Sequence, residues 1–252
     1  MTDGQGEWIR RYRAAPEAAV QVVCLPHAGG SASYFRPMAR ALFPTVEVLA
    51  VQYPGRMDRV NEPCVDDFAE LTERTLAAVR RELDRPVALF GHSMGALLAF
   101  EVAKRLEADG VEPLALFASG ARPPGRPLPR HAHTATDEEL IAELVALDGT
   151  DERLLDNEDM RVLVLSALRA DYRMLDSYRC DGPTVACPVV SLTGDDDPVV
   201  SIDDAAAWAS HTVGRSDLHV FPGGHFYLDD HWADVGEVLT TRLGTHLPTR
   251  TG

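Results

Sequence analysis

The stretch Leu89-Phe90-Gly91-His92-Ser93-Met94-Gly95-Ala96-Leu97 decides how this chain folds. The apolar residues before Gly91 predict a buried strand, and the apolar periodicity after Gly95 predicts a helix, with a sharp turn between them. Ser93 lies at the apex of this turn, which requires neighbours without bulk. Its hydroxyl would lie at the N-terminus of the helix, whose free N–H groups favour developing negative charge. The stretch therefore predicts a nucleophilic serine, although the Gly-x-Ser-x-Gly pattern also occurs by chance.

Strands and helices alternate on both sides of this turn. Buried strands are predicted at residues 20–25, 46–53, 87–90, 113–119, 189–193 and 218–221. Amphipathic segments that read as helices separate most of them, and parallel strands need such crossover connections. The pattern predicts an α/β fold with a mostly parallel, doubly wound sheet, and we expect residues 1–252 to form one domain.

The alternation stops between about residues 121 and 180. The segment Ala121–Pro129 is rich in proline, glycine and arginine, as a hinge is. A capping box at Thr136 opens one helix, and a second helix is predicted from about Asp159 to Tyr178. We interpret the two helices as a lid inserted over an active site, with Leu144 and Tyr172 on faces that would cover its pocket. Ordinary packing of extra helices against the edge of the domain is the alternative.

Two residues later in the chain are suited to activate Ser93. Asp197 lies just past a predicted strand, and His225 lies in a glycine turn past the last strand. Both positions belong to the carboxyl edge of the sheet, where Ser93 also emerges and where ligands bind in open sheets of this kind. A serine needs a base and the base needs an orienting acid, and the chain order Ser, Asp, His is expected of α/β-hydrolases. We predict a triad of Ser93, Asp197 and His225.

Each partner has a competitor. Pro198 holds the turn directly after Asp197, which favours Asp197, but Asp195 in the same turn remains an alternative acid. His92 is a poorer base because adjacent residues in such a turn point apart. The turn containing Gly29 and Gly30 lacks the Gly-x-Gly-x-x-Gly spacing of dinucleotide sites, and we read it either as a source of backbone N–H donors for a reacting oxygen or as a plain strand-to-helix turn.

Composition excludes several classes of function. The chain has 24 lysines and arginines against 39 acidic residues, a net charge of −15 that argues against nucleic-acid binding. The N-terminus is polar, and no apolar run approaches the length of a membrane span. The four cysteines form no Cys-x-x-Cys pair, and His131 and His133 have no nearby pattern of metal ligands. We expect a monomeric cytoplasmic protein with reduced thiols, no bound metal, no membrane contact and no nucleic acid.

Four segments resemble those of one family, the type II thioesterases, which are stand-alone editing enzymes of polyketide and nonribosomal peptide assembly lines. They are Leu25-Pro26-His27-Ala28-Gly29-Gly30-Ser31-Ala32, Gln52-Tyr53-Pro54-Gly55-Arg56, Gly91-His92-Ser93-Met94-Gly95 and Gly223-Gly224-His225-Phe226. The resemblance covers nearly the whole chain, and the first two segments are its most specific part.

The resemblance implies Ser93 as nucleophile, His225 as base and Asp197 as the acid that orients it. It also implies that the backbone N–H groups of Ala28 and Met94 stabilise the oxyanion. The implied reaction is the hydrolysis of unwanted acyl groups from the phosphopantetheine arm of an acyl or peptidyl carrier protein, with no cofactor of the enzyme's own. Two alternatives remain: a serine esterase or thioesterase that acts on free small molecules, and a non-catalytic adaptor for carrier proteins.

Arginines gather near the predicted active edge. Arg122, Arg126 and Arg130 share one proline-rich loop, and Arg56 and Arg59 follow another strand that ends at the same edge. Carrier proteins of these pathways are generally acidic, and the planar guanidinium group suits phosphate. We expect some of these arginines to form a basic rim that meets the carrier or its phosphate, and a solvated hinge is the alternative.

Overall fold

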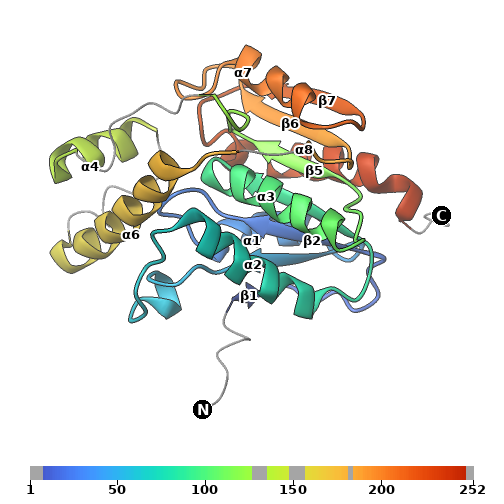
Figure 1. Ribbon diagram of the computed structural model, residues 1–252, viewed down its shortest axis with the longest axis horizontal. Coiled ribbons are helices and arrows are strands. Elements are labelled where there is room, and N and C mark those ends of the chain that lie inside the picture. The colour runs from blue at the N-terminus through green and yellow to red at the C-terminus, as the bar shows by residue number, and fades with distance from the viewer. Residues whose placement is uncertain (1–7, 127–134, 148–156, 181–183, 248–252) are drawn as a thin grey trace.

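The computed structural model describes residues 8–126, 135–147, 157–180 and 184–247. A seven-stranded sheet in the order β1-β3-β2-β4-β5-β6-β7 runs through the centre of the molecule (Figure 1). β1 pairs antiparallel with β3, and the five other neighbouring pairs are parallel. The strands are β1 (Ile9–Arg10), β2 (Val20–Leu25), β3 (Val46–Val51), β4 (Val87–His92), β5 (Leu116–Ser119), β6 (Val189–Gly194) and β7 (Ser216–Phe221). The predicted α/β class with a mostly parallel sheet is confirmed.

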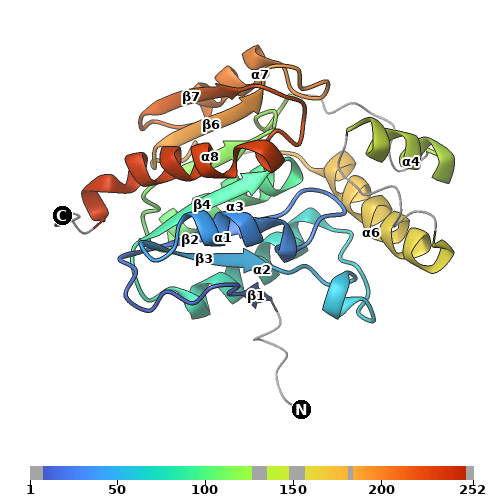
Figure 2. The same cartoon turned by 180° about the vertical axis from the view of Figure 1, so that it is seen from behind.

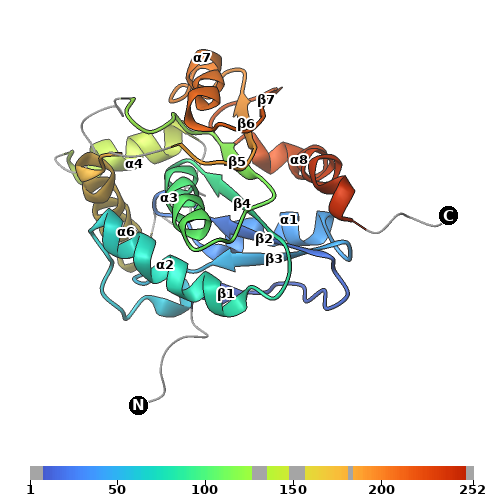
Figure 3. The same cartoon turned by 45° about the vertical axis from the view of Figure 1, so that its right-hand side comes forward.

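Helices cover both faces of this sheet. α2 and α3 lie side by side on one face (Figure 3), and α1 and α8 lie on the other (Figure 2). The described helices are α1 (Arg36–Ala41), α2 (Phe68–Glu82), α3 (Met94–Ala108), α4 (Asp137–Ala146), α6 (Glu158–Ser177), α7 (Ile202–Ala206) and α8 (Leu228–Leu243). None of them is both long enough and apolar enough to cross a membrane within the described ranges.

Two hydrophobic cores follow from this layering. Side chains alternate across the sheet along each strand, so Val23 and Leu25 of β2 pack in the core beneath α2 and α3, while Val22 and Cys24 pack in the core beneath α1 and α8. A strand covered on both faces needs apolar side chains on both, and apolar residues dominate β2, β3 and β4. The polar exceptions in β2 and β3 are Gln21 and Glu47, which are buried and hydrogen-bonded to each other at 3.0 Å. The four cysteines are free thiols, as expected.

Helices α4 and α6 lie beyond the edge of the sheet where the parallel strands end (Figures 1 and 2). They enclose a small third core of Leu140, Leu144, Leu165 and Leu168, separate from the two main ones. The Arg169 guanidinium on α6 joins them by donating to the Ala135 carbonyl at 2.8 Å and to Asp137. In chain order both helices come between β5 and β6, where the sequence predicted two inserted helices.

Candidate active site

Ser93 has a strained backbone at the junction of β4 and α3. Its φ and ψ are 55° and −121°, a region that residues other than glycine rarely adopt. The glycines on either side permit it, because a Cβ atom on Gly91 would lie 2.1 Å from the Gly95 carbonyl oxygen. One on Gly95 would lie 2.0 Å from the carbonyl oxygen of Leu25 on β2. The turn therefore requires both glycines, and it places Ser93 at the carboxyl end of a central strand.

The structure brings Ser93, His225 and Asp197 into one hydrogen-bonded chain. His225 Nε2 lies 3.0 Å from Ser93 Oγ, and His225 Nδ1 lies 2.9 Å from Asp197 Oδ2. The other oxygen of Asp197 accepts from the backbone N–H groups of Val199, at 2.8 Å, and Val200, at 3.1 Å. A carboxylate accepts only, so Nδ1 of His225 donates and Nε2 is free to take the Ser93 proton. The arrangement is suited to general-base activation of a serine hydroxyl.

The competing residues have other contacts. Asp195 Oδ1 accepts from the Gly223 N–H at 2.9 Å, so this carboxylate braces the turn that carries His225 and does not orient the ring. His92 Nδ1 pairs with Ser119 Oγ at 3.0 Å, away from Ser93. Burial, helped by the nearby His225 and His27, holds the pKa of His92 well below its usual range. His92 is therefore a buried neutral side chain beside the site.

His27 is a second neutral imidazole at the site, and the sequence analysis gave it no role. Its ring packs edge-on against His92, with 5.8 Å between the ring centroids, and against Phe226 at 4.8 Å. Burial, and then the neighbouring His225 and Arg56, lower the pKa of His27 to about 3. Because His27 and His92 stay uncharged at neutral pH, neither places a positive charge next to His225 when that ring takes a proton.

The segments expected to supply oxyanion donors lie on either side of Ser93. Met94 follows it directly as the first residue of α3, and Ala28 shares a cavity wall with Ser93 and His225. The backbone of the next residue, Gly29, donates to Asp171 Oδ2 of α6 at 2.7 Å. Asp171 was not predicted from the sequence, although a single acid between the apolar Leu168 and Leu175 on one helix face was a signal that could have found it.

Two adjoining cavities are lined by residues of α4 and α6, the helices that the sequence predicted as a lid. The smaller, of about 110 Å³, is lined by Ser93 and His225, and the larger, of about 540 Å³, has a mainly apolar wall. The residues that line both are His27, Ala28, Leu144, Leu168 and Phe226. Tyr172 lines the smaller cavity, and its hydroxyl donates to Glu143 at 3.2 Å. The two lid residues chosen from the sequence, Leu144 and Tyr172, thus both lie at a cavity that reaches Ser93.

The arginines expected at a basic rim divide into two groups. Arg122 and Arg126 are partly exposed and share the carboxylate of Asp204 on α7. The rim expectation is wrong for Arg56 and Arg59, which are buried. The turn after β3 folds back on itself, with the Gly55 N–H donating to the Arg59 carbonyl at 3.0 Å, and both side chains find partners inside the protein.

Three residues named from the sequence, Arg130, His131 and His133, lie outside the described residues. In the parts of the chain that the structure describes, no three histidine, cysteine, aspartate or glutamate side chains are arranged so that they could hold a metal ion.

Comparison with known proteins identifies the relatives of this fold and site. The profile of the thioesterase domain family matches residues 20–243. The chain is 46% identical over 241 residues to thioesterase PikA5 of Streptomyces venezuelae, which covers 94% of this chain and 86% of that protein. It is 44% identical over 242 residues to a probable cadicidin biosynthesis thioesterase of Streptomyces griseus, covering 96% and 67%. Among solved structures, the type II thioesterase BorB from the borrelidin biosynthetic cluster has a TM-score of 0.87 at 47% identity, covering 94% and 97%.

These similarities extend over nearly the whole chain, from the first long strand to the last long helix. They include proteins in which the same fold is a stand-alone enzyme, and they confirm the resemblance to type II thioesterases that the four sequence segments suggested. The chain belongs to the thioesterase domain family and is a hydrolase of thioester bonds.

Proposed function

We propose that this thioesterase removes stalled or aberrant acyl groups from the phosphopantetheine arm of carrier proteins in a polyketide or nonribosomal peptide assembly line. The observation that carries the proposal is the hydrogen-bonded chain from Asp197 through His225 to Ser93. Ser93 and His225 line a cavity that residues of α4 and α6 also line. The names of the relatives support the assembly-line setting, since they include a type II thioesterase from the borrelidin cluster.

The first half of the proposed reaction transfers the acyl group to the enzyme. Ser93 Oγ attacks the thioester carbonyl carbon while His225 Nε2 takes its proton, and Asp197 stabilises the imidazolium that forms. The carbonyl oxygen becomes an oxyanion, which accepts hydrogen bonds from the N–H groups of Met94 and Ala28. When the intermediate collapses, the carbon–sulfur bond breaks and His225 returns the proton to the departing sulfur. The products are a pantetheine thiol and an acyl ester on Ser93.

The second half frees the enzyme. His225 takes a proton from a water molecule, which attacks the acyl carbon and forms a second oxyanion in the same place. The bond to Ser93 Oγ then breaks, His225 protonates that oxygen, and a carboxylic acid leaves. Both halves use side chains, backbone N–H groups and water, so we propose that the enzyme has no cofactor of its own. The phosphopantetheine belongs to the carrier.

The test compares two substrates and two variants. Ser93→Ala and His225→Ala should each lower kcat by about 10⁴-fold or more, because members of such a unit fail together. The wild type should show a higher kcat/KM on an acyl-carrier protein than on the matching acyl-N-acetylcysteamine, and a fluorophosphonate should label Ser93. Retention of a tenth of the turnover by either variant would contradict the mechanism.

The same measurements separate the alternatives. Equal kcat/KM values on the two substrates would indicate an enzyme of free small thioesters. Binding of the carrier protein with no hydrolysis and no labelling at Ser93 would indicate an adaptor.

A further inference from the structure

Asp171 of α6 is a buried charge that contacts the loop before Ser31. Its carboxylate has no solvent exposure and accepts from the Gly29 N–H at 2.7 Å. Arg56 donates to both of its oxygens, at 2.8 and 2.9 Å, in a bidentate pair. The same guanidinium donates to the Gly30 carbonyl at 3.3 Å. One ion pair thus holds the backbone of two consecutive residues, Gly29 and Gly30, in the loop that begins at Ala28.

A further contact holds the other end of this loop. Gln52, the first residue after β3, accepts from the Ala32 N–H at 3.2 Å and donates to the Arg56 carbonyl at 3.2 Å. Gly29 has a φ of +74°, which only glycine adopts readily. Because glycine also has the greatest backbone freedom, the loop needs contacts with other segments to keep one conformation. These contacts join the two sequence segments that most clearly marked the family, 25–32 and 52–56, to one acid on a lid helix.

The pair is costly to disrupt. Burial by itself would lower the pKa of Arg56, but the Asp171 carboxylate outweighs it and raises that pKa. Removing one partner leaves the other charged group buried and unpaired, which is far less favourable than an exposed charge. The loop therefore has little freedom while both charges are in place.

We propose that Asp171, paired with Arg56, is a positioning residue for the oxyanion site: it holds the backbone of Gly29 and Gly30 so that the Ala28 N–H faces the reacting carbonyl oxygen. The proposal rests on the proposed function, in which Ala28 supplies one of the two donors. It also gives α6 a second role. The helix lines the larger cavity, and its Asp171 orders the loop at 28–30, which lines the same cavity.

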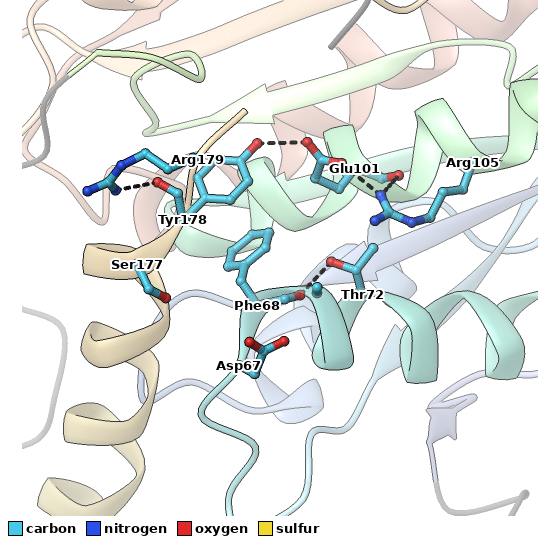
Figure 4. Close-up of a pocket in the computed structure, with 9 residues that line it drawn as sticks. Asp67, Phe68, Thr72, Glu101, Arg105, Ser177, Tyr178 and Arg179 are labelled. Carbon is cyan, nitrogen blue, oxygen red and sulfur yellow. Dashed lines mark hydrogen bonds and ion pairs between the residues drawn. The ribbon is translucent and has the colours of Figure 1, made fainter. Parts of the chain in front are cut away.

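A second attachment of α6 supplies a matched control. Past the end of the helix, the Tyr178 hydroxyl donates to Glu101 of α3 at 2.9 Å (Figure 4). The Tyr178 ring packs on Phe68 of α2, with 4.3 Å between the ring centroids. Tyr178, Phe68 and Glu101 line a pocket between α2, α3 and the end of α6, and none of the residues 28–30 lines it (Figure 4). Tyr178→Phe therefore weakens the attachment of α6 without altering any contact to the proposed oxyanion donor.

The experiment uses Asp171→Asn, which keeps the shape of the side chain but removes the charge that pairs with Arg56. Loss of one oxyanion donor costs about 10²- to 10³-fold in kcat, so a displaced donor should cost about 10- to 10²-fold. KM for an acyl-N-acetylcysteamine should change by less than about 3-fold. Tyr178→Phe should leave both constants within about 2-fold of the wild type.

Two inhibitors provide a measurement that a merely structural role would not change. S-trifluoroacetonyl-pantetheine forms a tetrahedral adduct with Ser93 whose oxyanion needs the donors, whereas S-propyl-pantetheine forms none. Asp171→Asn should weaken inhibition by the first in proportion to its loss of kcat/KM and leave the second unchanged. Equal weakening of both inhibitors, or the same split in Tyr178→Phe, would overturn the proposal.

Arg56→Lys makes the test independent of whether Asp171→Asn folds. It keeps the charge but cannot make the bidentate contact, and it should show the same selective loss of the first inhibitor in smaller measure. Wild-type behaviour of a folded Arg56→Lys variant towards both inhibitors would overturn the proposal. A wild type that fails to hydrolyse the thioester would instead overturn the proposed function.

Discussion

The backbone of Ser93 shows how much the site depends on single residues. A non-glycine residue in so rare a conformation costs of order 1–3 kcal/mol, and it persists only where its surroundings over-determine it. Those surroundings are the buried strand β4 before it, the buried start of α3 after it, and its N–H bond to the Ser119 carbonyl at 2.8 Å. This backbone conformation places the Ser93 hydroxyl within hydrogen-bonding distance of His225.

Two acids in one turn have different roles at this scale. Asp197→Asn should lower kcat by about 10⁴-fold, because an amide does not stabilise the imidazolium and favours the wrong tautomer of His225. Asp195→Asn keeps an oxygen that accepts from Gly223 and should lower kcat by less than about 10-fold. Steady-state kinetics on an acyl-N-acetylcysteamine measures both. The reverse ranking would show that Asp195 is the acid.

Helices α4 and α6 share a small hydrophobic core of four leucines, two from each helix. Leu140 and Leu144 belong to the same small core, but Leu144 also lines both cavities near Ser93, whereas Leu140 is fully buried and lines neither. The same helix therefore presents one residue that lines the cavities and one that serves packing alone.

Enlarging Leu144 should change which acyl chains are hydrolysed. Leu144→Phe fills part of the cavity, and each buried methylene contributes about 0.8 kcal/mol, so the ratio of kcat/KM for octanoyl over propionyl thioester should fall by about 10-fold. Tyr172→Trp at the smaller cavity should act in the same direction. Leu140→Phe, the control, should lower Tm by overpacking and leave the ratio unchanged. If all three variants keep the wild-type ratio of kcat/KM, α4 and α6 serve packing and do not select the acyl chain.

The charge of the whole molecule bears on how it meets a carrier. At −15 the chain repels another acidic protein, which slows encounter at low ionic strength. Arg122 and Arg126 lie next to α7 and share Asp204, with exposed side-chain fractions of 25% and 46% against 13% for the acid. We propose that they form a positive patch towards the carrier.

Reversing one charge tests this patch. Arg126→Glu should raise KM for an acyl-carrier protein by about 10-fold at low salt and by less at high salt, because screening weakens exposed charges. It should leave a small thioester unaffected. Arg74→Glu on α2 is the matched control, since Arg74 is 51% exposed and pairs with an acid, Glu70, of its own. An equal rise in KM for both variants would indicate net charge alone and no local patch.

The sequence alone determined the parts of this protein that depend on local pattern and on rules of topology. The sharp turn at Ser93 was predicted from two glycines between a strand and a helix. The α/β class was predicted from the alternation of buried strands and amphipathic helices. The carboxyl ends of parallel strands meet at one edge, so Ser93, His225 and the acidic turn were expected to be neighbours. The strand predicted over residues 113–119 begins later in the structure, at Leu116, although Ala115 just before it is fully buried and its carbonyl accepts from the Leu89 N–H at 3.0 Å.

Only the tertiary structure decided what depends on contacts between distant segments. Arg56 and Asp171 are 115 residues apart, and the sequence predicted Arg56 at an exposed rim. Asp195 and Asp197 are two residues apart in one turn, and the hydrogen bond to His225 distinguishes them. The physical reason is the same in both cases: a charged side chain is stable inside a protein only where its partner lies at bonding distance, and that distance is set by the packing of whole elements.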